Sequence, residues 1–498
     1  MNRRLVLLIP LLLPALALAP LARAQQRSQQ LPRDLQDADN RIMAEIRANA
    51  RIMENLEYLS DMIGPRLTGS PQMARASEWT RQKFAEYGLS ARLEPFEIAR
   101  AWTRGEASAR ILEPAPHRLT LAAAGWSPGT SGKVRGPVLH VEANTEEEFA
   151  RYRGRLKNAI VLVAPPTPVD PPSPPRLEGY PTPLPPEGQA PRGGRRPGGA
   201  GFGFRQRLTE LLKAEGAACV FHDSGLTHGL LNMTSRSAAG PFTPGVLPAA
   251  FVTHESYALL WRLLKRGPVT AEVELTNRFS DGPVTVHNTV AELPGTAPSG
   301  DPAEEAVILG AHLDSWDLGT GTTDNGTGSM VVLEAARALQ ALGLKPRRTI
   351  RFLLFNGEEQ GLVGSREYVK RHQAEMAKVS GVLVHDYGTG KVNYIGLQGN
   401  YECGPVMELL TAPLRRVGFE GIRTNRLGGT DHLSFAAAGV PAFACGQERA
   451  EYDRTHHSQS DTFDKAWKDD LLQGAMVLAV WAYNLASQPE MLPRKPQP

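Results

Sequence analysis

Imidazole and carboxylate side chains recur in this chain directly after apolar runs of the kind that form buried strands. Both groups bind Zn²⁺, at ~2.0–2.2 Å. A catalytic zinc usually has three protein ligands, so two histidines and three carboxylates suit two ions that share one carboxylate. We therefore predict a two-metal hydrolytic site with Asp324 as the bridging ligand. Its candidate side chains are His312, Asp314, Asp324, Glu358, Glu359, Asp386 and a histidine of the late cluster RTHHSQSDT at 454–462.

The adjacent acids Glu358 and Glu359 indicate two different tasks. Neighbouring side chains in a loop point in different directions, so Glu359 can bind metal while Glu358 stays off the metal and acts as the general base. We expect Asp314, two residues after His312, to accept the second imidazole N–H and fix its tautomer. Each motif alone has an ordinary explanation, such as an acid near a helix start or a turn with an N-cap. Their joint occurrence at successive strand ends favours a catalytic site.

Strands and helices alternate from residue 283 onward, which predicts an α/β sandwich with a mostly parallel central sheet. Parallel strands end at the same edge of a sheet, where sites form in such folds. His385 precedes Asp386 and faces the opposite side of the sheet, so we expect it to pack in the core. The predicted strands are 306–312, 348–356, 379–386 and 440–445, and the predicted helices are 326–344, 362–372, 403–418 and 468–486.

The N-terminus and the overall charge bear on location and partners. Residues 1–24 combine paired arginines, an apolar stretch and an Ala-Arg-Ala motif, which predicts a cleaved signal peptide and a periplasmic or extracellular location. The leader holds three arginines and no acid, so its removal takes the net charge from +3 to zero. Neither nucleic-acid binding nor membrane binding after cleavage is supported. Three scattered cysteines make a disulfide framework or a thiolate zinc site improbable.

The middle of the chain has a different character. The 498 residues are too many for one ordinary core. Short β-like runs surround a proline- and glycine-rich loop at 165–203, whose composition cannot pack a core. We predict a catalytic domain built from 25–100 and 283–498, interrupted by an inserted β-rich domain at 101–282.

Five blocks stand in the order found in a known family: HLDSWDLGTGTTDNGTG, NGEEQGLVGS, HDYGTG, GGTDHLSF and HHSQSDT. The chain resembles the co-catalytic two-zinc exopeptidases, which include bacterial leucyl aminopeptidases, glutamate carboxypeptidase and carboxypeptidase Q. The resemblance is strong over 283–490 and weak over 34–100. Within the family, the sequence AHLDSWD resembles most the carboxypeptidase Q branch. It implies a three-layer α/β/α sandwich, and the inserted segment is similar to a protease-associated domain.

The resemblance also implies which residues hold which ion. Two Zn²⁺ ions per chain would be bound, although cobalt or manganese suits the same ligands. Aligning HSQSDT with the family's H-x-x-x-D-T places the late ligand at His457 and leaves His456 as its rival. The first ion would take His312 and Asp386, the second would take His457 and Glu359, and both would share Asp324.

The implied activity is hydrolysis of terminal peptide bonds in dipeptides or short peptides, by a two-zinc-activated water with Glu358 as the general base. Asp431 and His432 match a family block that lines the substrate pocket. The choice among aminopeptidase, dipeptidase and carboxypeptidase stays open, and the resemblance allows a homodimer.

Three alternatives use similar residues. An aminoacylase- or desuccinylase-type amidohydrolase has the same ligand pattern, but its extra domain follows the glutamate pair, whereas the insertion here precedes His312. A glutaminyl cyclase-like acyltransferase shares the fold. A catalytically dead receptor-like binding protein would have lost ligands, whereas this chain keeps five ligands and the base.

Overall fold

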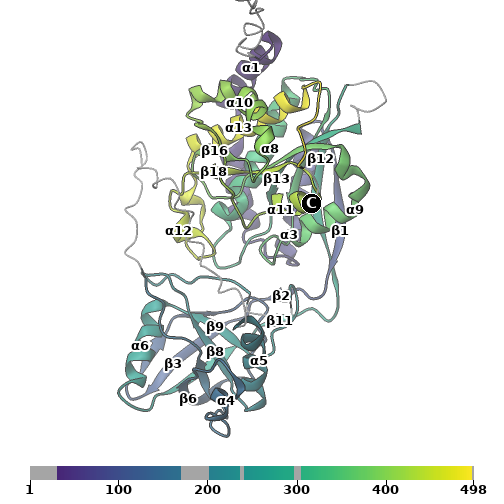
Figure 1. Ribbon diagram of the computed structural model, residues 1–498. Helices are drawn as coiled ribbons and strands as arrows, with labels where there is room; N and C mark the ends of the chain where they lie inside the picture. Colours follow the sequence, from purple (N-terminus) through teal and green to yellow (C-terminus); the bar gives the residue numbers. More distant parts are fainter. Residues whose placement is uncertain (1–30, 170–200, 236–239, 297–303, 496–498) are drawn as a thin grey trace, which may run out of the picture.

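Two large β-sheets organise the chain in the computed structural model (Figure 1). The predicted signal peptide and most of the predicted loop at 165–203 lie outside the described residues, but 201–203 open helix α5 (Gly201–Ala214) and are not loop. No helix in the described part of the chain is long and apolar enough to cross a membrane. The structure describes residues 31–169, 201–235, 240–296 and 304–495.

The first sheet has a parallel centre and antiparallel pairs nearer its edges. Its strands are, in order across the sheet, β1 (Ser90–Ile98), β12 (Val284–Leu293), β14 (Thr349–Phe355), β13 (Ala306–His312), β15 (Val379–Val384), β18 (Ala442–Gln447), β16 (Val392–Gly396) and β17 (Gly421–Arg423). The four strands from β14 to β18 run parallel. Strand β12 is antiparallel to both of its neighbours, and β16 is antiparallel to β18. The predicted mostly parallel sheet is therefore confirmed at its centre.

Helices cover both faces of this sheet because its strands are apolar on both sides. In β13, Val307 and Leu309 point into one core and Ile308 points into the other, as strand alternation requires. This arrangement confirms the three-layer α/β/α sandwich. One face carries α1 (Arg33–Asn49), α2 (Ile52–Glu57), α3 (Pro71–Glu86), α8 (Thr327–Ala341), α10 (Gly404–Thr411) and α13 (Lys468–Ala486), and the other carries α9 (Val363–Arg371) and α11 (His432–Ala437).

The second sheet lies within residues 101–282, which we call the inserted module, and it has a hydrophobic core of its own. A short ribbon of β2 (Trp102–Thr103) and β11 (Arg278–Phe279) stands where the chain enters and leaves the module (Figure 1). The similarity of the inserted module to a protease-associated domain stays a prediction. The strands are, in order, β4 (His117–Leu119), β3 (Ala107–Glu113), β10 (Thr270–Leu275), β6 (Val134–His140), β7 (Ile160–Leu162), β8 (Cys219–Asp223), β9 (Ala249–Val252) and β5 (Leu121–Ala123), and its helices are α4 (Glu146–Ala150), α5 and α6 (His254–Leu264).

Candidate active site

The carboxyl ends of the central strands bring the five predicted ligands into one cluster. Each comes from the end of a strand or from a loop beside it, because parallel strands end at a common edge of the sheet. His312 is the last residue of β13, Glu359 follows β14, Asp386 follows β15, Asp324 precedes α8, and His457 follows α12 (Tyr452–Thr455).

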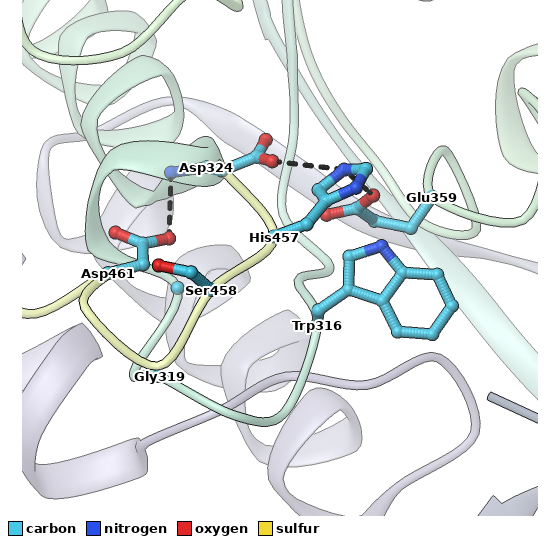
Figure 2. A pocket seen from close by; sticks show the side chains of 8 residues that line it. Trp316, Gly319, Asp324, Glu359, His457, Ser458 and Asp461 are labelled. Carbon is cyan, nitrogen blue, oxygen red and sulfur yellow. Dashed lines mark hydrogen bonds and ion pairs between the residues drawn. The ribbon is translucent and has the colours of Figure 1, made fainter. Parts of the chain in front are cut away.

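Asp324 lies between two groups of donor atoms. Its Oδ1 is 3.2 Å from His312 Nε2, which is 2.9 Å from Asp386 Oδ1. Its Oδ2 is 3.4 Å from His457 Nε2, which is 2.9 Å from Glu359 Oε2 (Figure 2). Ligand atoms around a tetrahedral zinc with bonds of ~2.0–2.1 Å stand about 3.3–3.4 Å apart. The spacing in both groups is therefore close to that of a metal site.

Several side chains of this cluster lack the partner that a cation would provide. Asp324 Oδ2 and Glu359 Oε1 are buried and have no hydrogen-bond partner among the described residues. Burial and the nearby carboxylate of Asp324 raise the pKa of Glu359 well above its usual range. Burial lowers the pKa of His457, so its imidazole is neutral at pH 7 and keeps a lone pair free. These donor groups fit divalent cations.

Of the two adjacent histidines, His457 is better placed as a ligand. Its side chain is 17% exposed and lies within 2.9 Å of Glu359. The side chain of His456 is 45% exposed, and its Nε2 is 3.8 Å from Asp324 Oδ2. The His456 ring stacks on His457 with 3.7 Å between the ring centroids.

His385 lies away from this cluster, as expected from the strand alternation. Its side chain is buried, and its ring packs against Gly474 of α13. Burial lowers the pKa of His385 to about 3, so it is a neutral core residue. The prediction that it packs in the core is confirmed.

Asp314 has different partners from those predicted. His312 Nδ1 is 2.9 Å from the backbone oxygen of Asp314 but 3.6 Å from its carboxylate, which is too far for a hydrogen bond. The carbonyl can only accept, so Nδ1 carries the hydrogen and Nε2 faces the ligand cluster. The prediction that the carboxylate fixes the tautomer is therefore wrong, because the chain turns after β13 and presents the carbonyl instead.

The Asp314 carboxylate holds the glutamate pair. It accepts the backbone N–H of Glu358 at 3.2 Å and that of Glu359 at 3.3 Å, and the Thr68 hydroxyl at 3.1 Å. One carboxylate thereby connects the HxD motif after β13 to the EE motif after β14. It acts on the site by fixing backbone positions.

Glu358 stands apart from the ligand pairs. In the described part of the chain it forms no ion pair with either His312 or His457, whereas Glu359 pairs with His457. Burial raises the pKa of Glu358, and the negative charges of Asp386 and Asp431 raise it further. A carboxylate beside the ligands but not among them is suited to accept a proton.

Arg66 is a site residue that the sequence did not reveal. It is fully buried, and its guanidinium donates to the backbone oxygens of Leu313 at 2.7 Å, Thr320 at 2.9 Å and Gly321 at 2.5 Å. These carbonyls belong to the loop between two predicted ligands, His312 and Asp324. Its segment, GPRLTGS, has the composition of an ordinary turn, and nothing local in the sequence indicates that the arginine is buried.

Asp461 holds the backbone of the bridging residue. Its carboxylate accepts the N–H groups of Thr323 at 2.5 Å and Asp324 at 3.1 Å (Figure 2). Burial and the charge of Asp324 raise the pKa of Asp461 to about 7. The sequence offered only its place in the block HHSQSDT.

The two predicted pocket residues differ in their relation to the site. Asp431 is buried, its oxygens have no hydrogen-bond partner among the described residues, and its charge raises the pKa of Glu358. No hydrogen bond or ion pair joins His432 to the site in the part of the chain that the structure describes. Their role in substrate binding stays a prediction.

Comparisons with known proteins decide the family. The family described as "Peptidase family M28" matches residues 288–482. Carboxypeptidase Q of Rattus norvegicus is 30% identical over 449 residues, which cover 89% of this chain and 87% of that protein. The chain belongs to peptidase family M28. It is therefore a metallopeptidase, which confirms the resemblance seen in the sequence and disfavours the receptor-like alternative.

Solved structures agree with the fold of this M28 peptidase. A peptidase M28 precursor from Shewanella amazonensis SB2B aligns with a TM-score of 0.74 at 28% identity, covering 93% of this chain and 100% of that one. An aminopeptidase from Aneurinibacillus sp. strain AM-1 aligns with a TM-score of 0.61 at 22% identity, covering 92% and 98%. The second similarity concerns the fold alone.

Proposed function

We propose that this M28 peptidase is a zinc-dependent exopeptidase that hydrolyses terminal peptide bonds of dipeptides or short peptides. The observation that carries the proposal is the position of Asp324, whose two oxygens each face a different histidine–carboxylate pair. The mixture of imidazole and carboxylate donors suits zinc. His312 and Asp386 would hold one ion, His457 and Glu359 the other, and Asp324 would contact both.

Each residue then has a task in hydrolysis. When bound, the ions supply Lewis-acid chemistry, which lowers the pKa of water and polarises the scissile carbonyl. Glu358 accepts a proton from the attacking water and delivers it to the amine nitrogen as the C–N bond breaks, so one water is consumed per bond. Asp314 keeps the backbone of Glu358 in place, and Asp461 does the same for Asp324.

Export belongs to the proposal as well. The leader-like residues 1–24 support a periplasmic or extracellular enzyme that acts on small peptides, without nucleic-acid or membrane partners after cleavage. A homodimer is proposed from the resemblance alone. The N-terminal sequence of the exported protein would test the cleavage site, which we place after Ala24.

The activity is tested by the cleavage rate of one dipeptide in three forms: both ends free, N-acetylated and C-amidated. Cleavage of the free form alone would indicate a dipeptidase of the carboxypeptidase Q kind. Cleavage of the C-amide but not of the N-acetyl form would indicate an aminopeptidase. If a protein loaded with metal cuts none of the three, peptide hydrolysis as proposed is wrong.

A further inference from the structure

The inserted module makes direct hydrogen bonds to the loop that carries His457. The backbone N–H of Met233 donates to the backbone oxygen of His457 at 2.8 Å. Two residues further on, Gln459 accepts the N–H of Leu231 at 2.9 Å and donates to the oxygen of Gly229 at 2.9 Å. A short stretch of the module therefore pairs with the loop on both sides of Ser458, next to the candidate ligand.

Trp316 provides a second connection from the other side. It follows β13 in sequence, yet its indole is buried in the core of the inserted module, where it meets the ring of Trp126 edge to face at 6.4 Å. It also meets the ring of His457 edge to face, with centroids 6.0 Å apart (Figure 2). The next residue, Asp317, pairs with Arg104 of the module through two hydrogen bonds of 2.5 and 2.9 Å.

The packing leaves the His457 ring little room to turn. The cavity beside it, lined by Trp316, Asp324 and Glu359 among others, has a volume of about 10 Å³. That is about enough for one water molecule. On the module side, a Cβ added at Gly125 would lie 2.6 Å from the Trp316 ring, so the close approach of the module depends on a glycine.

We propose that the inserted module positions His457, directly through the Met233 N–H and indirectly through the Trp316 ring against which it packs, and so sets the affinity of the ion that His457 binds. A backbone N–H and an indole ring offer no lone pair to a metal ion, so Met233 and Trp316 would act on the ion through His457 and are positioning residues. This inference rests on the proposed function, in which His457 is a ligand. The competing explanation is that the same contacts only stabilise the fold.

The test uses the full-length protein, with Zn²⁺ alone as the probe. The affinity for each ion is measured by competition with a chromophoric chelator, and the unfolding of the metal-free protein is measured in parallel. Met233→Pro removes the backbone N–H that donates to the His457 oxygen. Met233→Leu is its matched control because it keeps that N–H. Trp316→Leu removes the aromatic contact with His457. Trp316→Phe is its matched control, because it keeps an aromatic ring at this position. His457→Ala serves as the reference for loss of the ligand.

We expect Met233→Pro and Trp316→Leu to lower the affinity for one ion, the ion that His457→Ala loses, by about 10- to 100-fold. This is the usual effect of losing a group that orients a ligand. The other ion should keep its affinity, and the two conservative variants should bind like the wild type. If one of the two disruptive variants fails to fold, the other decides.

The failures are distinguishable. Normal zinc affinity in Met233→Pro and Trp316→Leu would overturn the inference while leaving the proposed function intact. Equal loss of both ions, in proportion to the lost stability of the metal-free protein, would also overturn it in favour of a purely structural role. Two retained ions in His457→Ala would contradict the ligand assignment and the inference together.

Discussion

At the scale of single residues, the two adjacent glutamates have different tasks, although one carboxylate holds the backbone of both. Asp314 accepts both of their N–H groups, which fixes the turn after β14. From that turn the side chain of Glu359 reaches His457 at 2.9 Å, whereas Glu358 makes no such pair within the described residues. Identical side chains thereby have different tasks.

Glu358→Gln tests this division. The amide keeps the size of the side chain but cannot accept the water proton, so we expect kcat to fall by about 10²- to 10⁴-fold with the zinc content unchanged. Glu359→Gln is the matched control and should lose zinc. Substantial turnover in fully metal-loaded Glu358→Gln would contradict the role of the base.

Arg66→Lys tests the loop between His312 and Asp324. Lysine keeps the charge but has three donors and no planar fork, so some of the loop carbonyls lose their partner. We expect the free energy of unfolding to fall by about 2–4 kcal/mol and zinc binding to weaken. Denaturant unfolding and zinc competition would measure both effects, with the exposed Arg51→Lys as control. Wild-type values in both would show that Arg66 does not hold the loop.

At the scale of elements, helix α1 carries an acid into the interface with α13. Asp39 is buried, and its carboxylate accepts a hydrogen bond from the Asn484 amide at 3.3 Å. Burial raises the pKa of Asp39 from 3.8 to about 7, although Asn484 opposes the shift. The folded protein therefore binds this proton more tightly than the unfolded chain does.

The sign of the resulting pH dependence follows from that difference. Between pH 4 and pH 7 the native state holds the extra proton, so the free energy of unfolding falls as the pH rises, in total by on the order of a few kcal/mol. Asp39→Asn should make this slope shallower and stabilise the protein at pH 8, while Asp461, whose pKa is also raised to about 7, keeps its own contribution to the slope. Thermal unfolding across this range would measure it, with the exposed Asp37→Asn as control. An unchanged slope in Asp39→Asn would assign the effect to other groups.

The sequence predicts elements where the pattern is local. The long apolar strands β13, β14 and β15 and the closing helix α13 were recognisable because burial on both faces or helical periodicity marks them. Strand β12 was not recognisable in the sequence, because Asn288 interrupts its apolar pattern at a buried position. That side chain donates to the oxygen of Gly364 at 2.9 Å and accepts the N–H of Asn356 at 3.0 Å. Such partners exist only in the folded molecule.

The residues of the site also fall into two groups, those that the sequence predicts and those that it does not. The candidate ligands could be predicted because their chemistry is carried by residue type and by their places at strand ends. Arg66 and Asp461 could not, because each acts on the backbone of a distant segment. The partner of His312 was predicted wrongly for the related reason that a backbone carbonyl competes with a side chain and leaves no trace in the sequence.

At the scale of the whole molecule, the candidate site uses both sheets. The first sheet supplies the ligands at the ends of its parallel strands, and the inserted module reaches the same loops through Met233 and Arg104 and through its packing against Trp316. The insertion lies between two segments of the catalytic sheet, β1 and β12, which pair side by side. The two ends of the module are therefore held together at one edge of the first sheet.

The central claim is that Asp324 is shared by two metal ions in one chain. The most direct measurement is the number of zinc ions bound per folded chain, determined by titrating the metal-free protein and by elemental analysis, in the wild type and in Asp324→Ala. We predict two ions in the wild type, and weaker binding of both when Asp324 is replaced. A single ion at saturation, or an Asp324→Ala protein in which only one ion is affected, would contradict the account.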